Sequence, residues 1–217
     1  MGFESHSAET TKEIGNIQGE AEDLFKICNV IWDNGQFDAF LEYYKSFHHL
    51  VHRTTLLREP DIILDLKNLT RDLIQDHGNG VLFILFGETH APMVDPLKVE
   101  FGQDNVGFTE INLGVNFVGL MIDGLRQGRP VSDEIYAQSF LDYKMSLLVQ
   151  ESAMRRGQVE SYARSFESIA ATVYTIARSF SINQIQEICQ NGEDILNVLR
   201  VHHNAIPLLP YISRLII

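Results

Sequence analysis

The sequence predicts a predominantly helical α+β fold, with a helical bundle around a long helical hairpin (about residues 132–180) and a small antiparallel sheet (about 81–115). The first observation is a seam of apolar residues in 158–180, spaced alternately by three and four as on the buried face of a packed helix. It comprises Val159, Tyr162, Phe166, Ile169, Val173, Ile176 and Phe180. The second observation is the unbroken apolar run 81–86, whose length favours a buried strand.

Composition sets the class of protein. Of the 217 residues, 45% are hydrophobic and 21% are charged, which is ordinary for a soluble globular protein. We expect a disordered N-terminal arm over residues 1–12, which are polar and lack periodicity, and a single globular domain over 13–217. The formal net charge of −12 argues against binding to nucleic acid or to an anionic membrane surface.

The sequence favours a cytoplasmic location. The N-terminus has no basic region followed by an apolar core, and no apolar run is long enough to span a bilayer. Cys28 and Cys189 are far apart, and each lies in an apolar helical pattern. We therefore expect two buried thiols in a reducing compartment.

Apolar periodicity predicts three helices in the N-terminal third. The first runs from about Thr11 to Asp33 and is stopped by Asn34 and Gly35. The second covers about residues 36–57. A third follows, with Pro60 in its first turn, where the missing N–H costs nothing.

Three strands are predicted in the next segment. They are the run 81–86, a second strand over 97–101, and a third over 106–115 with alternating residue types. A sheet of this size needs a helical layer for stability.

The remaining chain is predicted to be helical. A short helix at 117–127 precedes the hairpin, whose first helix starts after the N-cap Ser132, carries two apolar stripes and ends at Gly157. Two apolar stripes imply a central helix with partners on both sides. After Ser181 come two shorter helices, the second over 195–201. The apolar tail 205–217 is expected to dock, either on its own domain or on a partner.

Candidate sites are few. Ala163, Ala170 and Ala177 form a row beside the seam, where small side chains would let another helix approach closely. His48 and His52 lie four residues apart on one helix face, a workable spacing for metal ligands. The alternative to metal binding is that both histidines have a structural role. A loop after the first strand adds Glu88 and His90, which could serve acid–base chemistry or bind a divalent metal. The alternative there is a simple connector between strands.

The function that follows is a non-enzymatic helical interaction or regulatory protein that associates with itself as a homodimer or with another protein. No nucleophile elbow or phosphate-binding glycine loop occurs. Residues 181–200 can be laid over a helix-turn-helix, but Glu193 and Asp194 would meet phosphates with negative charge. The alternative is a small-molecule- or metal-binding sensor or enzyme that uses His48, His52, Glu88 and His90. Neither reading identifies a cofactor.

Overall fold

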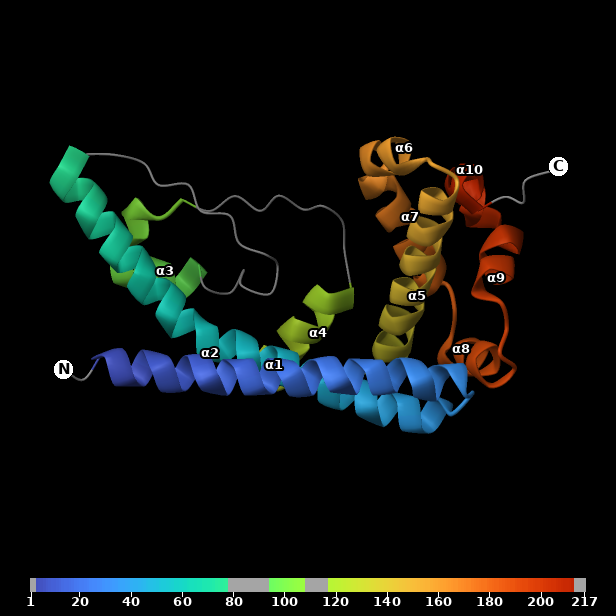
Figure 1. Cartoon of the computed structure of the whole chain (residues 1–217), viewed down its shortest axis with the longest axis horizontal. Helices are drawn as coiled ribbons and strands as arrows, with labels where there is room; N and C mark the ends of the chain where they lie inside the picture. Colours follow the sequence, from blue (N-terminus) through green and yellow to red (C-terminus); the bar gives the residue numbers. More distant parts are fainter. Residues whose placement is uncertain (1–2, 78–93, 108–116, 213–217) are drawn as a thin grey trace. The chain divides into compact units, whose positions relative to one another are not determined.

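The chain divides into two compact units. A computed structural model describes residues 3–77, 94–107 and 117–212. Unit 1 contains Met1–Leu24 and Ser46–Glu110, and unit 2 contains Phe25–Lys45 and Ile111–Ile217. The helices α1 (Phe3–Asp33) and α2 (Phe37–His77), which are labelled in Figure 1, each contribute residues to both units. None of the described helices is long and apolar enough to cross a membrane.

In unit 1, two short elements follow the two long helices. They are α3 (Val94–Phe101) and the 3-10 helix η2 (Gln103–Asn105). A small core joins α3 to α2, with buried Leu66 and Leu97 surrounded by Ile62, Ile63, Phe101 and Val106. Along α1, the buried residues Ile14, Ile17 and Ala21 recur every three or four positions, as expected for an amphipathic helix.

The prediction of a small antiparallel sheet is wrong, because no strand occurs among the described residues. The segment 97–101, predicted as the second strand, forms most of α3. Asp95 and Pro96 in the first turn favour a helix, because a carboxylate suits the helix dipole and proline needs no N–H partner there. The exposure of Val99 distinguishes a helix from a strand. Residues 97 and 99 would face the same side of a strand, yet Val99 is 83% exposed and Leu97 is 5% exposed. The predicted strand 81–86 and most of 106–115 lie outside the described residues.

The predicted second and third helices are one continuous helix, α2, with Pro60 inside it. Proline removes one backbone hydrogen bond and strains the preceding turn, but it does not always end a helix. Apolar residues continue on both sides of this position. Packing of Ile62, Ile63 and Leu66 against α3 stabilises the part of α2 that follows the proline.

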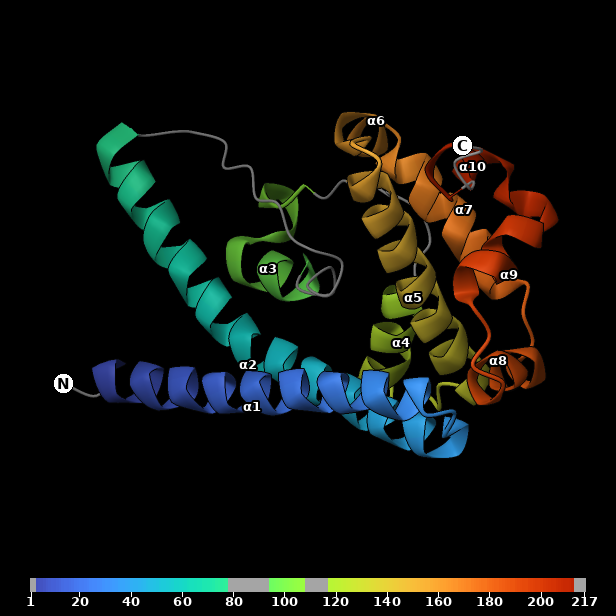
Figure 2. The ribbon, with the colours of Figure 1, turned by 45° about the vertical axis from the view of Figure 1, so that its right-hand side comes forward.

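Unit 2 is built around α5 (Asp133–Arg155), as its two apolar stripes predicted. The helix packs against α4 (Phe117–Arg126), α6 (Val159–Arg164), α7 (Phe166–Arg178), α8 (Ile182–Gln190), α9 (Ile195–Val201) and α10 (Leu209–Ile212). Figure 2 shows α4 and α7 beside α5. Ser132 caps α5 by accepting from the Ile135 N–H, and Gly157 follows with a φ of 67°, so both predicted ends are confirmed.

The core of unit 2 is aromatic. The fully buried ring of Phe140 lies 4.5–6.2 Å, between centroids, from the rings of Phe25, Trp32, Phe40, Tyr44 and Tyr143. Aromatic pairs at these separations are stabilised by edge-to-face and offset contacts in addition to burial. The end of α1 and the start of α2 are therefore integral parts of unit 2.

The C-terminal segment docks on unit 2. The 3-10 helix η3 (His203–Leu208) and α10 bury Ala205, Leu208, Tyr211 and Ile212, and η3 lies against α7. The Ser152 hydroxyl donates to the Tyr211 carbonyl at 2.6 Å, and Arg200 Nε donates to the Ile212 carbonyl at 2.8 Å. Docking of the tail on its own chain is thus confirmed as far as residue 212. We call residues 203–212 the strap.

Candidate functional site

The seam helix predicted over 158–180 is interrupted. It forms α6 and α7, separated at Ser165, whose φ of −106° and ψ of 8° depart from helical geometry. The Ser165 N–H still donates to the carbonyls of Ser161 and Tyr162, both at 3.1 Å. Ser165 therefore closes α6 and lets α7 start in a new direction.

The break divides the apolar seam into a buried part and an exposed part. Ile169, Val173 and Ile176 on α7 are at most 3% exposed, as a packed seam requires. Val159 and Phe166 are 52% and 55% exposed, although the periodicity placed them on the same buried face. The expected seven-residue internal seam is therefore only partly internal.

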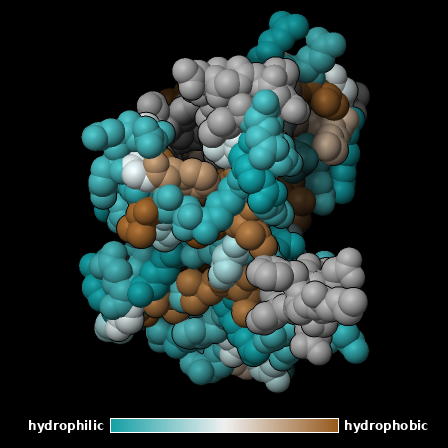
Figure 3. Space-filling model, turned by 90° about the vertical axis from the view of Figure 1, so that its left-hand side faces the viewer, coloured by the Kyte–Doolittle hydropathy of each residue, from teal (hydrophilic) through white to brown (hydrophobic). Residues whose placement is uncertain are grey.

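We define the α6 surface as Met154, Val159, Ala163 and Phe166, all exposed and all within 13 consecutive residues. Beneath it, the Tyr162 ring contacts the ring of Phe166 at 6.1 Å and that of Tyr211 at 6.0 Å. Single exposed apolar residues are common on proteins. Figure 3, for example, shows a face where hydrophobic residues lie in small groups between hydrophilic ones. The α6 surface differs because its residues are close in sequence and because the half-buried Tyr162 ring links Phe166 to the buried Tyr211.

Charges of both signs flank the α6 surface. Arg164 pairs with Glu160 at 3.5 Å, and Arg155 pairs with Glu151 at 3.4 Å. Both pairs join residues four apart on one helix and are largely exposed, so each contributes only a few tenths of a kcal/mol at most. These side chains cost little to rearrange when another molecule approaches.

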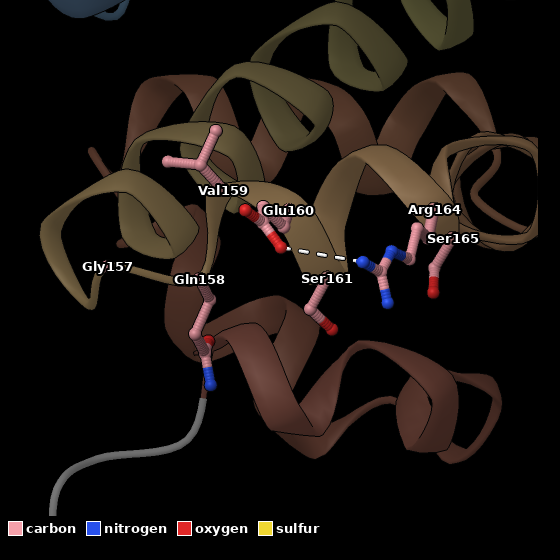
Figure 4. A pocket seen from close by; sticks show the side chains of 7 residues that line it. All are labelled: Gly157, Gln158, Val159, Glu160, Ser161, Arg164 and Ser165. Carbon is pink, nitrogen blue, oxygen red and sulfur yellow. Dashed lines mark hydrogen bonds and ion pairs between the residues drawn. The ribbon is translucent and has the colours of Figure 1, made fainter.

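A depression adjoins the α6 surface and shares Val159 with it. It has a volume of about 580 Å³, is open to solvent, and is lined by Gly157, Gln158, Val159, Glu160, Ser161, Arg164 and Ser165 (Figure 4). The Tyr211 hydroxyl lies 3.2 Å from the Ser161 hydroxyl, and hydrogen bonds with Ser161 and Ser165 lower the pKa of Tyr211. Among the described residues that line it there is no histidine or thiol.

The alanine row meets three different environments. Ala163 is exposed, Ala170 is half-buried, and Ala177 is fully buried within unit 2. Of the three candidate interface alanines, Ala163 alone is fully available to a second molecule.

The histidine candidates lie in unit 1, on α2. His48 is 3% exposed, and its ring packs on the Phe47 ring at 4.9 Å between centroids. Desolvation, with a smaller contribution from His49, lowers the pKa of His48 to about 4, so the imidazole is neutral near pH 7. His52 lies half-buried one turn further on. Glu88 and His90 lie outside the described residues. Within 3–77, 94–107 and 117–212, no three His, Cys, Asp or Glu side chains are grouped to hold a metal ion.

Both cysteines are buried thiols, as predicted. Cys28 is 0% exposed and Cys189 is 2% exposed. Burial raises the pKa of each to about 11, which keeps them protonated and poorly reactive.

Sequence reasoning missed Asp142. This carboxyl lies on α5 and forms no hydrogen bond or ion pair with the described residues. Desolvation raises its pKa to about 7. A carboxylate between the two apolar stripes of a central helix is the signal that could have identified it.

No family model, no curated protein and no solved structure matches this chain, so no relative supplies roles for its residues.

Proposed function

We propose that this is a helical interaction protein that self-associates through the α6 surface. The observation that carries the proposal is the exposure of Val159 and Phe166, 52% and 55%, at seam positions that the periodicity assigns to a helix interface. Covering them against a partner removes apolar area from water, at about 25 cal/mol per Å².

A second copy of the chain suits this surface because exposed apolar residues lie on it and charges of both signs flank it. In a two-fold dimer the same patch meets itself, so residue i contacts residue j and residue j contacts residue i. We expect the two α6 helices to run antiparallel in this dimer. Ala163 then lies at the helix crossing, where its small side chain permits close approach, and Val159 and Phe166 lie on either side of it.

The expected interface is small. A six-residue helix with flanking residues falls near the lower size class, below about 1,200 Å², which is typical of weak or transient association. We therefore expect a reversible dimer with a dissociation constant of roughly 1–100 µM.

Light scattering over a concentration series tests the proposal. The variants are Phe166→Glu and a matched control, Val201→Glu, which adds the same charge at a residue of unit 2 that is 84% exposed on α9. The wild type and the control are expected to shift from monomer to dimer as concentration rises, and Phe166→Glu to stay monomeric. A monomeric wild type, or equal loss in both variants, would overturn the proposal.

A further inference from the structure

His202 connects the strap to α7 through both nitrogens of its ring. The Asn204 N–H donates to His202 Nδ1 at 3.2 Å, which makes His202 the N-cap of η3. The other nitrogen, Nε2, lies 3.1 Å from the Ser179 hydroxyl. That hydroxyl in turn donates to the Ile176 carbonyl at 2.6 Å, at the end of α7.

These contacts fix the tautomer of His202. Because Nδ1 accepts the Asn204 N–H, it carries no proton, and the proton of the neutral ring is on Nε2. The Ser179 hydroxyl gives its own proton to Ile176, so its oxygen is free to accept from Nε2. The chain from the Asn204 N–H to the Ile176 carbonyl is complete only when His202 is neutral.

We propose that His202 makes the docking of the strap on α7 sensitive to protonation, because the neutral imidazole caps η3 and the imidazolium cannot. A second proton on Nδ1 places two N–H groups against each other at the start of η3. The hydrogen bond between Nε2 and Ser179 remains. The hydrogen bond that caps η3 is lost, and the Nδ1–H and the Asn204 N–H repel each other. Because η3 lies against α7, loosening of η3 would expose the buried side chains of Ala205 and Leu208.

The surroundings of His202 favour the neutral ring. The His203 ring stacks on it at 4.6 Å and 22°, and the apolar Phe180 ring lies 5.7 Å away. Desolvation and then the neighbouring His203 lower the pKa of His202. Among the described residues of the adjoining helices, Arg178 contacts the Tyr174 hydroxyl, and Arg200 contacts Asn197 and Ile212. The phenol of Tyr211 on α10 is held by Ser161.

The sign of the effect follows from linkage. A histidine whose folded pKa lies below its unfolded value of about 6.5 stabilises the docked state above that pH. The contribution is lost as pH falls below about 6.5 toward the lowered folded pKa. The strap is therefore docked at neutral pH and loosens on acidification.

Hydrogen exchange of the full-length chain from pH 7.5 to 5, corrected for intrinsic rates, tests this inference. Protection of the 203–212 amides is expected to fall about tenfold on acidification, the effect of losing one capping bond of about 1.4 kcal/mol. In His202→Asn, whose side chain caps a helix without titrating, protection should be high at both pH values. In His202→Ala it should be low at both.

Two results would overturn the inference. One is protection in the wild type that does not change with pH. The other is unchanged pH dependence in His202→Asn, which would assign the effect to another group. A titration of the imidazole resonances of His202 by NMR supplies a readout that does not depend on any variant. Exchange of these amides reports on one chain, whether or not it dimerises.

Discussion

The side-chain amide of Gln138 donates a hydrogen bond to the backbone carbonyl of Phe180, at 2.9 Å. The same nitrogen lies 3.2 Å from the carbonyl of Arg178, the last residue of α7. Carbonyls at a helix C-terminus have no partner within the helix. One buried side chain of α5 thus satisfies the end of α7 and fixes the two helices in register.

Replacement of Gln138 should be costly. We expect Gln138→Ala to lower the free energy of unfolding by about 2 kcal/mol, because it leaves carbonyls at the end of α7 without a donor. Gln150→Ala, a half-buried position on the same helix, is the control and should change stability by about 0.5 kcal/mol or less. Urea denaturation measures both. Equal losses in the two variants would show that the Gln138 bonds contribute nothing specific.

Gly35 combines a left-handed conformation with a close contact. Its φ is 71°, and a Cβ atom there would lie 3.2 Å from the Gln190 carbonyl oxygen at the end of α8. Gly192 has a similar φ of 59° with nothing within 4 Å. Substitution of either glycine by alanine should lower the free energy of unfolding by about 1 kcal/mol, because alanine is strained in the left-handed conformation. Thermal unfolding should show that Gly35→Ala costs at least about 1 kcal/mol more. An equal loss of stability in Gly35→Ala and Gly192→Ala would mean that the turn at Gly35 can shift away from the Gln190 carbonyl at no cost.

His48 should make unit 1 sensitive to acid. Its pKa of about 4 in the folded chain lies below the unfolded value of about 6.5, so the stability it contributes is present above pH 6.5. That contribution, on the order of 3 kcal/mol, is lost as pH falls through about 4. His48→Leu should flatten this dependence, whereas His49→Leu, at an exposed neighbour that makes the smaller contribution, should leave most of it in place. The free energy of unfolding, measured by urea denaturation at several pH values, distinguishes the two variants.

Asp142 should act in the opposite direction in unit 2. Its folded pKa of about 7 lies above the unfolded value of about 3.9, so folding favours the protonated form. The contribution of Asp142 to stability is therefore most favourable below pH 4 and is lost as pH rises through 7. Asp142→Asn should therefore stabilise the protein at pH 8, by about 1–2 kcal/mol because the carboxyl keeps some contact with water. Asp123→Asn, exposed on α4, should have no such effect. A stabilisation that is equal at pH 4 and pH 8 would contradict burial of the charge.

The sequence was most informative where a local chemical signal coincided with periodicity. Ser132 and Gly157 marked the two ends of α5, and Ser181 marked the start of α8, where it forms a capping box with Gln184. Each signal acts within four residues, so it can be recognised without knowing the tertiary structure. The central position of α5 followed from apolar residues on two of its faces.

Prediction failed where two patterns share the same residues. Leu97 and Phe101 are spaced by four, which suits a helix face, and they also alternate with Lys98 and Glu100, which suits a strand. Packing against α2 favours the helix, and the α2 residues in that contact are distant in sequence from residues 97–101. Pro60 could begin a helix or lie within one, and only the packing after it distinguishes the cases.

The candidate site was predictable only in part. The seam correctly indicated an interface for Ile169, Val173 and Ile176, which are buried. The break at Ser165 had no signal in the periodicity, so the exposure of Phe166 could not be anticipated. Exposure depends on which helices cover a face, and those helices come from distant parts of the chain.

Disulfide trapping at Ala163 tests the central proposal most directly. Cys28 and Cys189 are buried, so an introduced thiol would be the accessible one among the described residues. If Ala163 lies at the two-fold crossing, mild oxidation of Ala163→Cys should give a covalent dimer, because a disulfide forms only when two Cα atoms are within about 7 Å. Ala171→Cys, exposed on α7, should remain monomeric, and adding Phe166→Glu to Ala163→Cys should prevent trapping. A monomeric Ala163→Cys, or equal trapping at Ala171, would contradict self-association through the α6 surface.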